Sequence, residues 1–318
     1  MENNYVIIML DSTAPSFCYY KRGTKQEKIS FENLKKAIEY CQENHFFITV
    51  IYPEYELEDE IQQLLEDLPH IKILPISQIK LLEEGDLLVV DYKQEKELFD
   101  KIPENNYLNL ILRMEMAEIC NIENIYYNHH HKFCRLSIIL TDIQHADENA
   151  LNQYRLNLKR IKDYIYKDQN FDSELQISIL TDRITLSEMN NCNAGLVHFT
   201  IAPNGKFYIC PGFYFDVPNS NIGSFKENIK IANRHLLTIQ SSPICSLCNC
   251  YHCKRCIYLN KKTTLELNTP SHEQCVTSHH ERNTTGILLE TLQKRGLFPN
   301  TKPILPLFYL DPFEIIKQ

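Results

Sequence analysis

Short apolar runs and amphipathic segments alternate along the first part of the chain, which predicts strands and helices in turn. Runs typical of strands buried on both faces lie at 5–10, 46–52, 71–76, 87–91, 108–112, 134–143 and 175–180. Apolar residues at helical spacing lie at 34–41, 57–68, 95–102, 114–127 and 147–167. This alternation is typical of α/β proteins with a parallel sheet, and six or seven such units fit a partial or complete (β/α) barrel.

The pattern changes near residues 182–191, where the helical periodicity ends and cysteines begin. Pro203-Asn204-Gly205 lies between two short apolar segments, and an Asn-Gly pair there indicates a hairpin because both residues tolerate positive φ. Helices are expected at 226–239 and 286–296, followed by a Pro-rich extended arm. We therefore divide the chain into an α/β partial barrel at 1–185, a small cysteine-rich domain at 186–285, and a C-terminal helix and arm at 286–318.

Composition narrows the class of partner. The 318 residues are 43% hydrophobic, enough for a sizeable core, and the net charge of −8 disfavours nucleic acid or an anionic membrane as the main partner. The N-terminus lacks the pattern of a signal peptide, and no run of about 18 apolar residues occurs. We expect a cytoplasmic protein, in which thiols stay reduced and clustered cysteines indicate metal rather than a disulfide framework.

Eight of the twelve cysteines fall in one stretch and are the candidate metal ligands: Cys192, Cys210, Cys245, Cys248, Cys250, Cys253, Cys256 and Cys275. Two closely spaced C-x2-C pairs are typical of metal sites. Four thiolates can hold one zinc ion or one iron–sulfur cluster, so eight match two sites of four. Nearby histidines at 252, 272, 279 and 280 are alternative ligands, although we expect most of them to be exposed.

The spacing of these cysteines resembles a known domain. Cys192-x12-Gly205-x4-Cys210, a cysteine-dense block at 245–256 and a lone Cys275 are similar to the SPASM domain of radical SAM peptide-modifying enzymes. That resemblance implies one or two 4Fe–4S clusters, of which eight cysteines match two, with zinc as the alternative metal. The usual block is C-x2-C-x5-C-x3-C, whereas this chain has C-x2-C-x4-C-x2-C with Cys250 inside it.

The resemblance also implies how the ligands are grouped. Cys192, Cys210 and Cys256 would hold the first cluster, with Cys250 as a fourth ligand. The second cluster would be held by Cys245, Cys248, Cys253 and Cys275. Exchanging Cys250 and Cys253 between the groups is an equally open assignment.

The α/β half resembles a radical SAM partial barrel, but the C-x3-C-x2-C signature is absent. Laid over the loop after the first strand, that motif falls on Asp11, Pro15 and Cys18. One thiolate cannot hold the catalytic cluster, so no S-adenosylmethionine is expected. We interpret Cys18 as a relic or loop-packing residue, with a reactive thiol as the alternative. Asp11 is interpreted as a turn cap rather than a general base.

The segments Leu10-Asp-Ser-Thr13, Phe17-Cys18-Tyr19 and Ile51-Tyr-Pro-Glu-Tyr55 are similar to the CXXX-repeat peptide maturases. That similarity implies a maturation factor whose partner is a ribosomally synthesised Cys-repeat precursor peptide. A non-catalytic scaffold that presents the peptide to a separate modifying enzyme, and a zinc-binding interaction module, are the alternatives. The sequence assigns no catalytic residue and leaves open whether the chain is an enzyme. The other cysteines (Cys41, Cys120 and Cys134) are most simply buried apolar residues.

Overall fold

A computed structural model describes residues 4–308 except 94–98, 100–101, 103–107, 170, 172, 183, 187, 190, 218 and 252. Within this part of the chain, ten strands form one sheet in the order β10-β9-β8-β1-β2-β3-β4-β5-β6-β7. The strands are β1 (Tyr5–Met9), β2 (Phe47–Ile51), β3 (Ile71–Pro75), β4 (Leu87–Asp91), β5 (Leu108–Met114), β6 (Phe133–Leu140), β7 (Gln176–Ile177), β8 (His198–Ile201), β9 (Lys206–Tyr208) and β10 (Gly223–Ser224).

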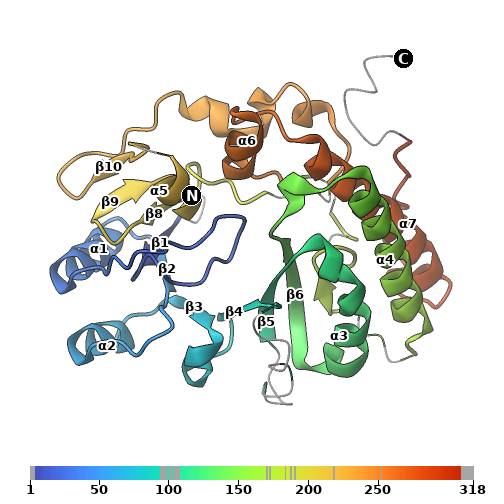
Figure 1. Cartoon of the computed structure of the whole chain (residues 1–318), viewed down its shortest axis with the longest axis horizontal. Coiled ribbons are helices and arrows are strands. Elements are labelled where there is room, and N and C mark those ends of the chain that lie inside the picture. The colour runs from blue at the N-terminus through green and yellow to red at the C-terminus, as the bar shows by residue number, and fades with distance from the viewer. Residues whose placement is uncertain are drawn as a thin grey trace.

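The described helices are α1 (Phe31–Glu43), α2 (Asp59–Glu66), α3 (Ile122–His129), α4 (Glu148–Lys167), α5 (Pro211–Asp216), α6 (Ile257–Thr264) and α7 (His272–Gln293). In Figure 1 the strands curve as an open arc, with α1, α2, α3 and α4 on its outside. The segment that carries α6 lies across the top of the arc, between α5 and α7. None of the helices in the described residues has the length and apolar character needed to cross a bilayer.

The sheet is mostly parallel because helices connect its strands. β1 through β7 are all parallel to their neighbours, and β8 pairs in parallel with the other edge of β1. Only β9 and β10 run antiparallel. The predicted α/β class with a parallel sheet is therefore confirmed. The sheet also continues past the expected domain boundary at 185, since β8 and β9 come from the cysteine-rich half.

Both faces of the parallel strands are buried, which explains their continuous apolar runs. On one face, alternate residues such as Ile8, Val50 and Leu74 pack with the buried side of α1, which includes Leu34 and Cys41. On the inner face of the arc, a second cluster takes one or two residues from each of the strands β1 to β6: Ile7, Met9, Ile51, Ile73, Val89, Ile111 and Ile139. Cys41 is a core residue, as expected.

Several helix predictions are confirmed and others are wrong. α1 begins where Ser30 accepts a hydrogen bond from the backbone N–H of Asn33, and α4 begins at a similar cap. The expected helix at 226–239 does not form; this segment contains a turn with φ of +51° at Asn233 and two short 3-10 helices. The helix at 95–102 falls largely outside the described residues.

The C-terminal helix is much longer than predicted. α7 begins at His272, where Ser271 caps it, and it continues through residue 285, the expected end of the cysteine-rich domain. Cys275 therefore lies in the first turn of a helix rather than in a loop. α7 packs along α4, and the Tyr154 hydroxyl of α4 donates a hydrogen bond of 2.5 Å to Glu281 of α7.

His280, on the buried side of α7, makes this packing sensitive to pH. Burial is the largest cause that lowers the pKa of His280 to about 4, and the charges of Arg155, His279 and Lys159 act in the same direction. The folded chain therefore holds His280 neutral, whereas the unfolded chain protonates it below about pH 6.5. This contribution to stability is complete above pH 6.5 and is lost as the pH falls towards 4.

We predict that His280→Gln reduces the fall in the free energy of unfolding between pH 7 and pH 4 by about 3 kcal/mol relative to the unmodified chain. Urea unfolding at a series of pH values measures this. Substitution of the exposed His235 by Gln is the matched control and should leave the pH dependence unchanged. Equal pH profiles for the unmodified chain and His280→Gln would contradict the assignment.

Candidate functional site

Four cysteines from separate segments lie close together, and we call them the four-thiol group: Cys18, Cys192, Cys210 and Cys256. The thiols of Cys18 and Cys256 share a hydrogen bond. The charge of Cys18 also raises the pKa values of Cys192 and Cys210. The charges of Cys192 and Cys210 in turn raise the pKa of Cys256. Three members are among the predicted metal ligands, whereas Cys18 was interpreted as a relic or packing residue.

The sheet and its hairpin bring these segments together. Cys18 lies in the loop between β1 and α1, and Cys192 precedes β8, the strand that pairs with β1. The predicted hairpin at 203–205 is confirmed, with Gly205 at φ of +72°. Cys210 follows that hairpin directly and is the residue before α5, and Cys256 is the residue before α6.

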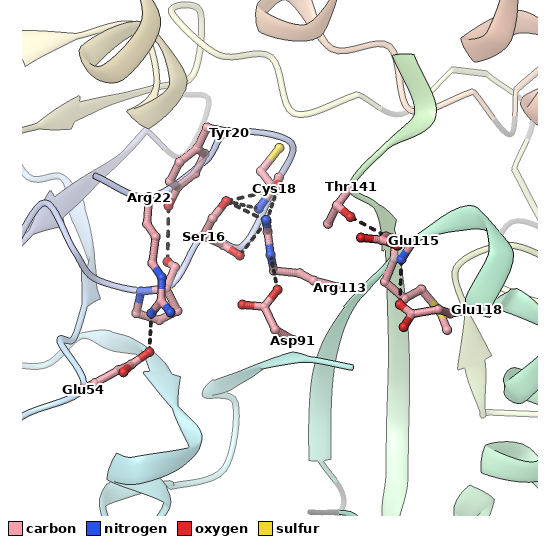
Figure 2. A network of polar contacts seen from close by, with 12 residues as sticks. Ser16, Cys18, Tyr20, Arg22, Glu54, Asp91, Arg113, Glu115, Glu118 and Thr141 are labelled. Atoms are coloured by element: carbon pink, nitrogen blue, oxygen red, sulfur yellow. Dashed lines mark hydrogen bonds and ion pairs between the residues drawn. The ribbon is translucent and has the colours of Figure 1, made fainter. Parts of the chain in front are cut away.

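Arg113, near the end of β5, fixes the loop that carries Cys18. Its Nε donates to the Asp91 carboxylate at 2.9 Å, while Nη1 donates to the backbone oxygen of Ser16 at 3.0 Å and to the Ser16 hydroxyl at 2.8 Å. Nη1 also donates to the backbone oxygen of Cys18. Figure 2 shows the guanidinium reaching this loop while the sulfur of Cys18 points away from it. A buried cation thus sets the position of the loop from across the sheet.

The protonation of the thiols differs within the group. The hydrogen bond from Cys256 is the main cause that lowers the pKa of Cys18, whereas burial raises it. A hydrogen bond from the Tyr19 backbone and the charges of Arg113 and Lys254 lower this pKa further. The same hydrogen bond, with burial, raises the pKa of Cys256 well above its usual value. The shared proton is therefore favoured on Cys256 over Cys18.

Burial is the main cause that raises the pKa values of the other two thiols. The pKa of Cys192 rises to about 11, and that of Cys210 is also raised. The residue Cys192 as a whole is nonetheless exposed to solvent, whereas Cys256 is buried. Four thiolates cannot coexist here without a positive partner, because their mutual repulsion adds to the cost of burial. A metal cation or cluster is the partner that this donor set fits.

Arg255 lies between the four-thiol group and the remaining cysteines. It is 4% exposed. Burial lowers its pKa, whereas the charges of cysteines from both groups raise it: Cys245, Cys253, Cys192 and Cys256. Its two terminal nitrogens donate to the backbone of residues 237 and 238 and to the Asn268 side chain. Its Nε has no hydrogen-bond partner among the described residues. A buried, unsatisfied N–H between two groups of thiols fits a negatively charged sulfur acceptor at this place.

The remaining candidate ligands gather beside α7. The backbone N–H of Cys250 donates to the Cys248 sulfur at 3.4 Å, and the Cys250 thiol donates to the Ser278 backbone oxygen at 3.3 Å. Burial, then the charges of Cys253 and Cys248, raise the pKa of Cys250. The structure thus places Cys250 beside Cys248 and Cys253, because a tight turn joins these residues. Near Cys192, Cys210 and Cys256 lies Cys18, whose charge raises the pKa of each of these three thiols.

Histidines near this second group are more buried than expected. His279 is 1% exposed, and its Nε2 lies 3.8 Å from the Cys248 sulfur. His280 is also buried, whereas His272 is exposed, and His252 lies outside the described residues. Cys245 and Cys275 are both buried.

The thiols do not form a ready-made coordination shell. None of the twelve cysteines, all of which are described, forms a disulfide. Among the described residues, no three His, Cys, Asp or Glu side chains converge closely enough to hold a metal ion. Closing either group around a metal therefore requires side-chain rotation from the present hydrogen-bonded positions.

Asp11 is a turn residue, as predicted. It is fully buried, and one carboxylate oxygen accepts hydrogen bonds from the Thr13 backbone at 2.6 Å and hydroxyl at 2.5 Å. The other oxygen accepts a hydrogen bond of 2.7 Å from Tyr55. Among the other cysteines, Cys120 is exposed and Cys134 half-buried, so the prediction that both are buried was wrong for Cys120.

Three cations of the site were missed by the sequence analysis: Arg113, Lys254 and Arg255. Lys254 donates to the Ser178 hydroxyl at 2.8 Å and to the backbone oxygen of Ile138 at 3.3 Å, which ties the cysteine-rich half to β6. A signal for Arg113 was present, because it is the one charged residue in the apolar run of β5. Lys254 and Arg255 stand between two cysteines of a C-x2-C pair.

Comparisons with known proteins give likenesses among solved structures alone. No family model matches the chain, and no curated protein matches it. Among solved structures, Streptococcus suis SuiB bound to the precursor peptide SuiA aligns with 85% of this chain and 75% of its own, at a TM-score of 0.47 and 12% sequence identity.

We predict that Arg113→Met lowers the free energy of unfolding by about 3 kcal/mol, because several hydrogen bonds to a buried charged group are lost. Denaturant unfolding of the metal-free chain measures the change. The matched control is Arg22→Met, which removes an exposed ion pair with Glu54 and should change stability by no more than about 0.5 kcal/mol. Equal effects of the two substitutions would show that Arg113 does not anchor the loop.

Proposed function

We propose that this chain is a maturation factor for a ribosomally synthesised peptide with repeated cysteines, and that its cysteine-rich half holds two iron–sulfur clusters. The observation that carries the proposal is the gathering of Cys192, Cys210 and Cys256, from three separate segments, within reach of one another's charge. These are the residues that the SPASM resemblance assigns to one cluster. The second cluster would be held by cysteines of the block at 245–256 together with Cys275.

The loop after β1 supports the absence of a radical SAM core cluster. Of the three signature positions, only Cys18 has a thiol, and Pro15 has no ligating side chain. Both carboxylate oxygens of Asp11 are occupied by hydrogen bonds from Thr13 and Tyr55. Asp11 therefore does not replace a missing ligand without loss of that buried network, and no S-adenosylmethionine site is proposed.

The solvent-open side of Cys192 offers a direction of approach for a peptide. An iron–sulfur cluster supplies, when bound, an iron that takes a thiolate ligand or an electron. The chain itself supplies the protein thiols, the buried cations Arg113 and Arg255, and a loop held by hydrogen bonds. A peptide would approach the four-thiol group from the side of Cys192, since Cys192 is exposed and Cys256 is buried.

A second function is a metal-organised scaffold that presents the peptide to a separate modifying enzyme. Four cysteine thiols from separate segments are also the donor set of a structural zinc site. The segment between β10 and α7 has little regular structure apart from α6 and short 3-10 helices, so a metal would order it. Zinc with full four-cysteine closure favours this function, and an open iron favours the first.

We predict about eight irons and matching sulfide per chain after anaerobic purification and reconstitution, as expected for two 4Fe–4S clusters. A synthetic peptide with several Cys-x-x-x repeats should bind and change the Mössbauer spectrum of the iron. The matched peptide with Ser in place of Cys should bind more weakly and leave the spectrum unchanged.

Each result decides between the functions. About two zinc ions per chain, little iron and retained peptide binding would support the scaffold and exclude the iron–sulfur role. Equal binding of the Cys and Ser peptides would overturn the proposed Cys-repeat partner. The absence of binding by either peptide would also overturn it.

A further inference from the structure

We propose that Cys18 is the fourth protein ligand of a metal site completed by Cys192, Cys210 and Cys256, which joins the barrel loop to the cysteine-rich half. This inference rests on the proposed presence of a thiolate-bound metal and assigns one of its ligands. It replaces the interpretation of Cys18 as a relic. The site would draw its ligands from four segments, of which the first and last are more than 200 residues apart in sequence.

The loop that carries Cys18 is held in place by contacts that do not involve the thiol. Arg113 donates to the backbone oxygens of Ser16 and Cys18, and the Ser16 hydroxyl donates to the Cys18 oxygen at 3.0 Å. These bonds engage the backbone and the Ser16 side chain, so the Cys18 sulfur is left to point away from the guanidinium (Figure 2). The loop presents this side chain in a defined direction.

The same loop packs against the helix that follows Cys210. Tyr20 stacks on Phe215 of α5, with ring centroids 5.5 Å apart, and Tyr214 of α5 donates to the Glu27 carboxylate. At Gly23 an added Cβ would lie 3.3 Å from the Phe215 ring, so the backbone approaches α5 closely. These contacts hold the Cys18 loop against α5, the helix that Cys210 directly precedes.

α5 in turn packs against α6, which follows Cys256. An added Cβ at Gly212 would lie only 2.4 Å from the Tyr258 ring, so the two helices meet at a position that admits no side chain. Tyr258 also donates to Asp216 at the other end of α5. The Cys256 sulfur accepts a hydrogen bond of 3.4 Å from the Leu259 backbone N–H, which orients it at the start of α6.

Electrostatics supports thiolate ligands at this place. Arg113, Lys254 and Arg255 all act on members of the four-thiol group, and Arg113 and Arg255 are themselves buried. The Nε of Arg255, which has no partner among the described residues, would donate to a metal-bound sulfur.

The count of cysteines is consistent with this assignment. With Cys18 in the first site, the four thiols are complete without Cys250, which lies beside Cys248 and Cys253. Five candidate cysteines then remain for the second site: Cys245, Cys248, Cys250, Cys253 and Cys275. The choice between Cys250 and Cys253 becomes a question about the second site alone.

The test compares three full-length variants: Cys18→Ser, Cys250→Ser and the control Cys120→Ser, whose thiol is exposed and distant in sequence from the others. Each is purified anaerobically, reconstituted in parallel with iron and sulfide or with zinc, and assayed for metal per chain. Alkylation followed by peptide mass mapping then identifies which thiols the metal protects. Cys18→Ser should lose about half of the metal and expose Cys192, Cys210 and Cys256. Cys250→Ser and Cys120→Ser should keep those three thiols protected.

A second measurement needs no variant, in case Cys18→Ser folds poorly. In the unmodified chain, the Cys18 thiol should be protected from alkylation after metal loading and become reactive after chelation, together with Cys192, Cys210 and Cys256. Cys18 reacting equally in the loaded and chelated chains would overturn the inference, as would a Cys18–Cys256 disulfide in the loaded chain. Protection of Cys250 in place of Cys18 within the first group would also overturn it.

The outcomes separate this inference from the proposed function. If the chain binds only zinc and Cys18 is protected, Cys18 is a ligand and the iron–sulfur role is excluded. If the chain binds two iron–sulfur clusters and Cys18 is not protected, the proposed function is retained and Cys18 is excluded as a ligand. A chain that takes up neither metal overturns both.

Discussion

The parallel pairing of β1 with β8 is the constraint on which the site depends. β1 would be an edge strand if the sheet ended with the first half of the chain, and the loop after β1 would then have no contact with the cysteine-rich half. The register Tyr5 with His198 through Ile8 with Ile201 fixes the start of the second half against the start of the first. This register also positions Cys192, which lies shortly before β8, and the β8–β9 hairpin. Cys210 comes directly after the hairpin. One strand pairing thus brings together residues that are nearly 200 positions apart.

Three cations add further contacts between the segments that this strand pairing brings together. Arg113 reaches a loop that the sheet alone would leave free, and Lys254 and Arg255 tie the cysteine block to β6 and to the segment near 237 and 268. Arg113 and Arg255 are taken out of water, at a cost that their hydrogen bonds to backbone oxygens offset. The cations also favour negative charge at the neighbouring sulfurs. The polar groups of this site therefore stabilise the fold and set its chemistry at the same time.

The fold was largely predictable because its signals are local. Strands buried on both faces give continuous apolar runs, and α1 shows its cap at Ser30 and its buried face at Leu34, Ala37, Ile38 and Cys41. The Asn-Gly hairpin is likewise encoded in a few residues. The helix predicted at 226–239 was wrong because Ile229, Ile231 and Leu237 pack against the core without α-helical backbone. The start of α7 was missed because a 22-residue helix with polar residues buried between elements lacks a simple apolar stripe.

The candidate site was predictable only in part, since spacing identifies ligand types but not which segments meet. Cys192, Cys210 and Cys256 were grouped by resemblance. The role of Cys18 depends on contacts between β5, the β1 loop and α5 that no local pattern encodes. Cys18 lies in an incomplete signature motif, so no further cysteine stands near it in sequence to indicate that it is a metal ligand. Its partners become visible only when the tertiary contacts of Arg113 and Phe215 are known.

The position of β1 within the sheet has a consequence for synthesis on the ribosome. Its pairing with β2 needs residues only up to Ile51, whereas its pairing with β8 needs residues up to Ile201, about 150 residues later. At translation rates of about 5–20 residues per second, the second edge of β1 stays unpaired for about 8–30 s. During that interval a fully apolar strand presents open N–H and C=O groups to the cell. The nascent chain is therefore exposed to mispairing at β1, because its partner β8 is made long after its partner β2.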